Sequence, residues 1–249
     1  MRIEFRPNLQ PFLSSIQGIR SEKLPRITAS AINLTLGDAR DEIQATMSRV
    51  FVGVTPWTLR GVRIRRATRG DLRGEVYIDD EAGKGVPASR YVLAEVYGGD
   101  RRFKRIERAL QARGLLPSGM YVVPTKAAPI DAYGNVPGNF IVRVLSYLQS
   151  FTAAGYSANM NRDSRARKRL VKQGIGYFAG SPGRGLPMGI WERRQFAHGR
   201  AVRPIFLFVK RATYRKRLPF YEVAAQVFGS RFAPNFEQAF RFTLKGGQS

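Results

Sequence analysis

The stretch LPRITASAINLTLGDARDEIQATMSRVF, residues 24–51, decides the fold. Gly37 lies inside it and costs a helix about 1 kcal/mol relative to alanine, so we expect a kink or break near Gly37–Asp38. The apolar residues recur mostly three or four positions apart, which predicts one long amphipathic helix. They are Ile27, Ala31, Leu34, Ile43, Met47 and Val50. The motif TPW at residues 55–57 ends the helical run, because a residue before proline favours extended geometry.

Two-residue alternation follows this helix. Val62 and Ile64 alternate with arginines before the RGD motif at residues 69–71, and Val76 and Ile78 alternate with polar residues after it. This pattern predicts a β-hairpin with one buried face and, on its first strand, a strongly positive exposed face.

The rest of the chain predicts short helices and strands. A helix in RYVLAEVYGG ends at Gly98 and Gly99, and Asp100 caps the next helix. The runs GIGYFAG, GIWERR and RPIFLFVKR read as three antiparallel strands. The other expected elements are a helix over 101–113, a long loop over 116–139 around a strand in MYVV, a helix over 139–154, and a closing helix from Pro219 that is interrupted or ends near Pro234.

Together these patterns predict an α+β fold, in which a small, mainly antiparallel sheet is flanked by long helices. We expect about five strands and four helices. No break in composition demands a second domain, so residues 1–249 are expected to form a single domain with extended loops. Residues 1–20 are expected to form an N-terminal arm, and residues 156–173 a flexible basic loop between a helical half and a β-rich half.

Net charge is the strongest signal in the composition. The chain has 42 Lys and Arg against 18 Asp and Glu, a formal net charge of +24, while its hydrophobic fraction of 43% is ordinary for a globular protein. Such a chain favours a polyanionic neighbour, because cations that face phosphates release condensed counterions. DNA, RNA, an anionic membrane and an acidic protein surface all remain open at this point.

Several classes of chemistry are excluded or disfavoured by residue usage. The chain lacks cysteine, which removes disulfides, thiolate nucleophiles and Cys-based zinc sites. His198 is the only histidine and reads as a turn residue rather than a general base. No signal-peptide h-region or membrane-spanning apolar run is visible.

Clustered acids and one glycine-rich loop are the remaining enzyme signals. Asp79, Asp80 and Glu81 lie at a strand end, and GSPGRG at residues 180–185 lacks the Gly-Lys-Ser/Thr of a phosphate-binding loop. Asp38, Asp41 and Glu42 share a helix with Arg40 and Arg49, which are expected to pair with them. We therefore expect no enzyme activity, no catalytic or metal-ligating residues and no cofactor.

Basic residues concentrate in three windows, 60–73, 162–172 and 210–217, which hold six, six and five of them. No base-reading module is present, so contact with a backbone or a charged surface is favoured over sequence recognition. The candidate contacts to nucleic acid or to an acidic partner are Arg63, Arg65, Arg66, Arg165, Arg167, Lys168, Arg169, Lys172, Arg184, Arg215, Lys216 and Arg217.

The order of several phrases resembles the prophage minor tail proteins of the Z type, which are tail-completion proteins of tailed bacteriophages. The resemblance runs roughly over residues 29–225 and rests on ASAINLTLGDARDEIQATMSRVF, TPWTLRGVRI, YVLAEVYGGDRRFKRIERAL, GMYVVPT, DAYGNVPG, LPMGIWER and RPIFLFVKRATYRKRLPFYEVA. It implies a structural virion protein at the head-proximal end of the tail, joining tail to head around the DNA passage. TPWTLR, GGDRR and LPMGIWER would serve fold and assembly.

The resemblance also implies partners. These are copies of the same chain in a ring, expected to be hexameric, then tail-tube or neck proteins, and genomic DNA contacted without sequence preference in the lumen; no membrane contact is expected. The protein would be assembled in the host cytoplasm and reside in the virion. Aromatic residues are expected to supply the apolar area for assembly. They are Trp57, Trp191, Phe206, Phe208 and Phe236.

Two alternatives stay open. One is a sequence-independent nucleic-acid-binding protein that acts outside the virion, and the other is a metal-dependent nuclease that uses acids such as Asp38 or Asp79. A channel through which DNA slides cannot hold it tightly, so part of the positive charge is also expected to face acidic partner proteins.

Overall fold

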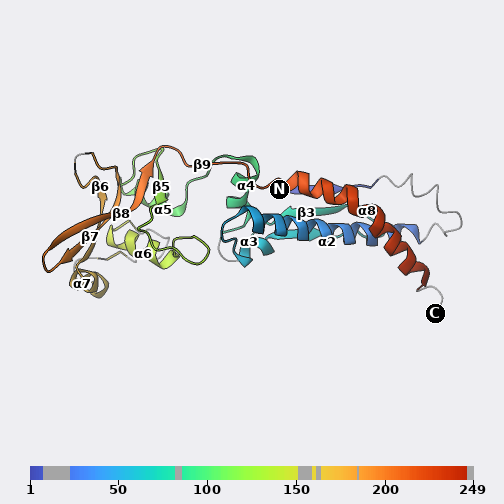
Figure 1. Ribbon diagram of the computed structural model, residues 1–249, viewed down its shortest axis with the longest axis horizontal. Helices are drawn as coiled ribbons and strands as arrows, with labels where there is room; N and C mark the ends of the chain where they lie inside the picture. Colours follow the sequence, from blue (N-terminus) through green and yellow to red (C-terminus); the bar gives the residue numbers. More distant parts are fainter. Residues whose placement is uncertain (8–22, 82–85, 151–158, 161–163, 184, 246–249) are drawn as a thin grey trace. The chain divides into compact units, whose positions relative to one another are not determined.

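The computed structural model describes residues 1–7, 23–81, 86–150, 159–160, 164–183 and 185–245 (Figure 1). The predicted α+β class is confirmed: the described residues form seven helices and three small antiparallel sheets. The even composition led us to expect a single domain, but the chain divides into two compact units, each with its own apolar core. Unit 1 comprises residues 1–99 and 214–249, and unit 2 comprises residues 100–213.

Unit 1 is built on two long helices that pack together beside a three-stranded sheet of order β1-β3-β2 (Figure 1). The predicted hairpin is confirmed, with Val62 opposite Ile78. Its elements are β1 (Arg2–Phe5), α2 (Leu24–Val50), α3 (Pro56–Arg60), β2 (Val62–Arg65), β3 (Gly74–Ile78), α4 (Ser89–Tyr97) and α8 (Phe220–Lys245).

Helix α2 runs from Leu24 to Val50 without the predicted break at Gly37. Its buried side chains include Ile32, Leu36 and Ile43, all with no exposed surface, whereas the predicted core residue Leu34 is 40% exposed. The helix packs against α8 and also against strands β2 and β3, so burial extends over a broad face. Tertiary packing on this scale outweighs the low helix propensity of one glycine.

Helix α8 also continues where the sequence suggested an interruption, since Pro234 lies inside it. The neighbouring Asn235 is 9% exposed and donates hydrogen bonds to Thr35 Oγ1 at 3.1 Å and to Asp38 Oδ2 at 2.8 Å on α2. These contacts hold α8 to α2 beside the position where proline removes a backbone hydrogen bond.

The expected N-terminal arm is in part a strand. Residues 2–5 form β1, which pairs with β3 in antiparallel register from Arg2 opposite Tyr77 to Phe5 opposite Gly74. Residues 8–20 of the expected arm lie outside the described residues. Four residues are too short for a reliable strand signal in sequence, so β1 was missed.

Unit 2 contains a four-stranded antiparallel sheet of order β5-β8-β7-β6, and the three strands predicted after Lys172 are confirmed. The expected flexible loop at 156–173 is wrong for residues 165–172, which form helix α7; residues 156–158 and 161–163 lie outside the description. The elements are α5 (Arg105–Ala112), β5 (Tyr121–Pro124), α6 (Gly138–Tyr147), α7 (Arg165–Lys172), β6 (Ile175–Gly180), β7 (Gly189–Phe196) and β8 (Gly199–Val209).

A buried ion pair fixes α5 against β5. Glu107, with no exposed surface, accepts hydrogen bonds from Arg101 and from the backbone amides of Lys104 and Val122. Burial alone would raise the pKa of Glu107, but the hydrogen bonds from Arg101, Val122 and Lys104 outweigh burial and lower the pKa. Helix α5 therefore begins at Arg105, and the predicted cap at Asp100 is wrong.

Asp100 serves a different role, in the two segments where the chain passes between the units. Strands β4 (Gly99–Asp100) and β9 (Thr213–Tyr214) form a two-stranded sheet, and Thr213 Oγ1 donates to Asp100 Oδ1 at 2.6 Å. Gly98 and Gly99, with φ of 73° and 91°, occupy the left-handed region that ends α4 and turns the chain into β4.

Candidate nucleic-acid interface

Positive charge is unevenly divided between the two units. Unit 2 carries 21 Lys and Arg against 5 Asp and Glu, a net formal charge of +16. Unit 1 carries 21 against 13, a net +8. Unit 2 is the smaller of the two, so its surface has the higher density of positive charge and is the first place to look for a polyanion site.

The few acids of unit 2 are committed to internal contacts. Glu107 and Glu192 are buried, and Asp100 accepts from Thr213. Asp131 accepts hydrogen bonds from two backbone amides within its own turn, and Asp163 lies outside the described residues. The exposed charge of unit 2 is therefore carried mainly by cations.

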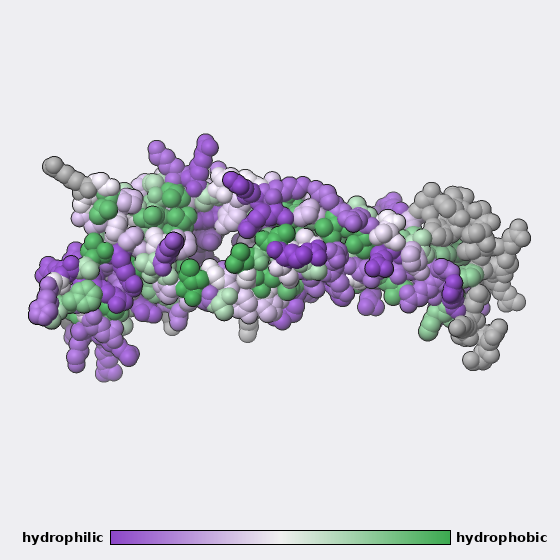
Figure 2. All heavy atoms as spheres, viewed as in Figure 1, coloured by the Kyte–Doolittle hydropathy of each residue, from purple (hydrophilic) through white to green (hydrophobic). Residues whose placement is uncertain are grey.

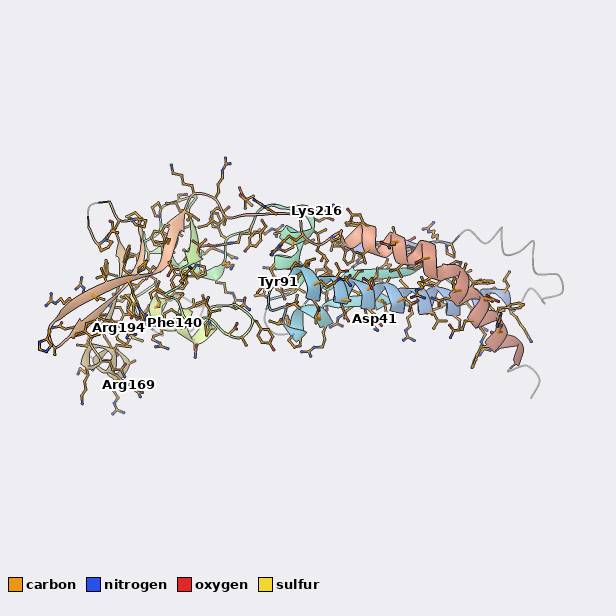
Figure 3. All side chains as sticks on the ribbon, in the orientation of Figure 1. Asp41, Tyr91, Phe140, Arg169, Arg194 and Lys216 are labelled. Atoms are coloured by element: carbon orange, nitrogen blue, oxygen red, sulfur yellow. The ribbon has the colours of Figure 1, made fainter. Side chains whose placement is uncertain are left out.

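Helix α7 presents four of these cations in one stripe. Arg165, Lys168, Arg169 and Lys172 are exposed and stand at i, i+3, i+4 and i+7, which places them on one helical face. Figure 2 shows hydrophilic side chains projecting where α7 lies in Figure 1, and Arg169 extends from α7 away from the strands in Figure 3. Ser164 caps the helix by accepting from the amide of Arg167 at 3.3 Å.

The opposite side of α7 attaches to the core of unit 2. Leu170 is 6% exposed, and the guanidinium of Arg167 lies 4.4 Å from the ring centroid of Tyr147 on α6. Arg167 also donates to the carbonyl of Met160 at 3.3 Å. Arg167 is therefore an anchored, partly buried side chain, although the sequence grouped it with the four exposed cations of the stripe.

A second group of cations lies on the β7–β8 hairpin. Its strands pair as far as Phe196 opposite Gly199, whereas the pairing of β6 with β7 stops at Arg194. Beyond that register the hairpin continues as a two-stranded ribbon whose residues from Gln195 to Arg203 are all exposed. Phe196, near the tip, is 56% exposed.

Two arginines of this hairpin share one buried carboxylate. Glu192 is 2% exposed, and its Oε1 lies 2.6 Å from Arg194 Nε and 2.9 Å from Arg203 Nη2. The two arginine side chains are 43% and 44% exposed. The carboxylate therefore holds both guanidinium groups in place while part of each stays open to solvent; Arg194 is labelled in Figure 3.

Tyr177 connects this group to α6 and α7. Tyr177 lies on β6, directly opposite Glu192 of β7. Its ring meets the ring of Tyr147 edge-on, with centroids 5.5 Å apart. Burial, and next the negative charge of Glu192, raise the pKa of Tyr177, so the hydroxyl stays protonated. A continuous series of contacts thus runs from Arg167 through both tyrosines to Glu192.

The basic candidates of unit 1 are mostly paired within the unit. Each pair has one exposed cation and one acid, at distances of 2.7–3.4 Å. The pairs are Arg63 with Asp79, Arg65 with Glu75, Lys216 with Glu222 and Arg217 with Glu95. Arg66 and Arg215 are exposed, and Arg184, in unit 2, lies outside the described residues.

Four of the five aromatic residues expected to serve assembly belong to the cores of the units. Trp191, Phe206, Phe208 and Phe236 are each 6% exposed or less, so the expectation of an assembly surface there is wrong. Trp57 alone of the five is open, at 47% exposure, with its indole N–H donating to the carbonyl of Val86 at 3.3 Å. Aromatic runs in sequence do not distinguish a subunit core from an interface.

Four of the acids considered for a nuclease, Asp38, Asp41, Glu42 and Asp79, are engaged in ion pairs or hydrogen bonds. Asp38 accepts from Asn235, and the expected partners on the same helix, Arg40 and Arg49, form ion pairs with Asp41 and Glu42, each at 2.7 Å. Within the described part of the chain, no group of three or more His, Cys, Asp or Glu side chains could hold a metal ion. His198 lies in the exposed turn between β7 and β8, as predicted.

The arginines of the β7–β8 hairpin were missed in sequence. The runs GIWERR and GRAVR carry Arg193, Arg194, Arg200 and Arg203, but they lie outside the three basic windows. The available signal was the arginines at the end of the predicted strand GIWERR and at the start of the predicted strand RPIFLFVKR, which lie near each other if the two strands form a hairpin. The pairing register, which brings Glu192 opposite Arg203, made the group visible.

Comparisons of the chain with protein-family models, with curated proteins and with solved structures gave no match. Among the described helices, none combines the length and apolar character needed to cross a bilayer.

Proposed function

We propose that this protein is a structural virion protein of a tailed bacteriophage, which forms a homo-oligomeric ring at the head-proximal end of the tail and contacts DNA through unit 2. The DNA contact is inferred from one observation, the basic surface of α7 and the β7–β8 hairpin, which is poor in acidic residues. Placement in the tail rests on the resemblance of the sequence phrases. The proposed role is structural, with no catalytic step.

The form of this surface suits contact with phosphates rather than with bases. The cations are spread over a helix face and two strands, and guanidinium and ammonium groups bind phosphates irrespective of sequence. Tail-tube or neck proteins would cover other parts of the ring, and Trp57 on unit 1 is an exposed apolar residue suited to such contacts.

A second candidate is a sequence-independent nucleic-acid-binding protein that acts outside the virion. The stripe of four cations on α7 favours it, because such a stripe can bind a polyanion without any ring. The two candidates differ in where the protein resides and in whether binding requires assembly.

The test of the proposed function is electron microscopy of particles made by a phage that carries an early stop codon in this gene. Filled heads beside complete, separate tails are the expected result, since the joint would be missing. Normal tailed particles would overturn the virion role and favour the second candidate. The matched control is the same stop-codon phage grown in cells that supply the wild-type protein from a plasmid.

A further inference from the structure

A row of side chains crosses three strands on one face of the unit 2 sheet. The register places Tyr177 on β6, Glu192 on β7 and Arg203 on β8 directly opposite one another. Arg194, two residues after Glu192, shares that face, because side chains alternate along a strand. The row passes from buried Tyr177 and Glu192 to the half-open Arg203 and Arg194.

The charges in this row do not balance. One carboxylate faces two guanidinium groups, so Glu192, Arg194 and Arg203 together keep one positive charge. A buried glutamate needs only one arginine to be paired, and each guanidinium has five N–H donors, of which Glu192 uses one or two. Donors and one charge remain available on the exposed side.

We propose that Arg194 and Arg203, held in position by Glu192, form an arginine clamp for one phosphodiester of a nucleic-acid backbone. The clamp deepens the DNA contact of the proposed function and rests on it. A phosphodiester carries one negative charge and several acceptor oxygens, which match the residual charge and the open N–H groups. The shared carboxylate fixes the two side chains before binding, which reduces the entropy lost when they engage the phosphate.

The surroundings extend the clamp along a strand of nucleic acid. Tyr177 contacts Tyr147, and Tyr147 carries the guanidinium of Arg167 on α7. Helix α7 is therefore attached near this row, and the cations on its exposed face are further candidates for phosphate contact. A polymer with regular negative charge fits cations spread over three elements better than an acidic patch on a folded protein does.

The experiment measures binding of the full-length protein to a labelled random-sequence 30-base-pair DNA duplex by fluorescence anisotropy between 0.05 and 0.5 M NaCl. The variant is Glu192→Gln/Arg194→Gln/Arg203→Gln, which removes the clamp without leaving a buried charge unpaired. Its net charge falls by one. The matched control is Lys126→Gln, an exposed residue of unit 2 outside α7 and the hairpin, which also lowers the net charge by one.

Loss of one phosphate contact should reduce the magnitude of the slope of log K against log salt by about 0.9. If the wild-type and variant lines meet at 1 M NaCl, the variant should bind roughly eightfold more weakly than the wild type at 0.1 M. The control should keep nearly the wild-type slope. If the triple variant fails to fold, Arg194→Lys/Arg203→Lys keeps the charges but loses the planar forks, and we expect weaker binding with an unchanged slope.

Three outcomes would overturn the clamp. The first is an equal loss of DNA affinity in the triple variant and in the control. The second is an unchanged DNA affinity in the double lysine variant. The third is competition by poly-glutamate as effective as that by unlabelled DNA, which would assign the surface to an acidic protein partner. None of them bears on the stop-codon phenotype, so the clamp can fail while the virion role stands. Equally, normal particles from the stop-codon phage would leave the binding result intact.

Discussion

Substitution of Glu107 by glutamine should destabilise unit 2 by about 3 kcal/mol. Glu107 pairs with Arg101, which is 9% exposed, and breaking a buried pair from one side costs about 3–5 kcal/mol. The lower end applies because Arg101 keeps hydrogen bonds to the carbonyls of Arg102 at 3.2 Å and Val122 at 3.1 Å. The glutamine side chain also places an NH2 group where one of the two carboxylate oxygens accepted from a backbone amide.

The assay is urea unfolding followed by tryptophan fluorescence in a Trp57→Phe background. Trp191, which is 4% exposed, is then the only tryptophan and reports on unit 2. Asp131→Asn is the control, because it makes the same carboxylate-to-amide change at an exposed turn of the same unit and should change stability by less than about 0.5 kcal/mol. A loss below about 1 kcal/mol in Glu107→Gln would refute the reasoning about the buried pair.

Three further predictions concern other parts of the chain. First, the folded state lowers the pKa of Glu107 below its ordinary value of 4.5, so the stability that ionised Glu107 contributes is fully present above pH 4.5 and is lost as the pH falls through the lowered pKa. Acid unfolding of Glu107→Gln should lack this pH-dependent loss of stability. Second, the hydroxyl of Tyr97 raises the pKa of Tyr221 to about 12. The substitution Tyr97→Phe should lower the pKa of Tyr221 toward its ordinary value of 10, as measured by ultraviolet titration. Third, Phe236→Ala should cost about 3–5 kcal/mol of unit 1 stability by urea unfolding, whereas Trp57→Ala should leave stability nearly unchanged and, in the proposed ring, weaken oligomers seen by light scattering.

Regular periodicity made the larger elements predictable. The spacing of Ile27, Ala31, Ile43 and Met47 gave α2, and the alternation around RGD gave the β2–β3 hairpin. Both depend on contacts that repeat along a continuous segment, so the segment alone carries the signal. The two interruptions expected at Gly37 and Pro234 did not occur, because α2 and α8 pack against each other along much of their length.

Features that depend on distant partners could not be predicted. Eight residues with five cations read as a loop, yet Leu170 and Arg167 attach them to the core as α7. The group of Glu192, Arg194 and Arg203 requires the register of β7 against β8, which no local pattern specifies. Candidate site residues chosen by charge density alone therefore included paired arginines of unit 1 and omitted the arginines held by Glu192.

Helix α7 itself argues for an anionic ligand. It contains no acid, and the pairs Arg165 with Arg169 and Lys168 with Lys172 place like charges four residues apart, each costing about 0.2–0.5 kcal/mol. Arg165 also stands in the first turn, where a positive charge opposes the helix dipole. The cap at Ser164, the buried Leu170 and the stacked Arg167 offset part of these costs. A bound polyanion would screen both repulsive pairs, so binding and helix formation at α7 would favour each other.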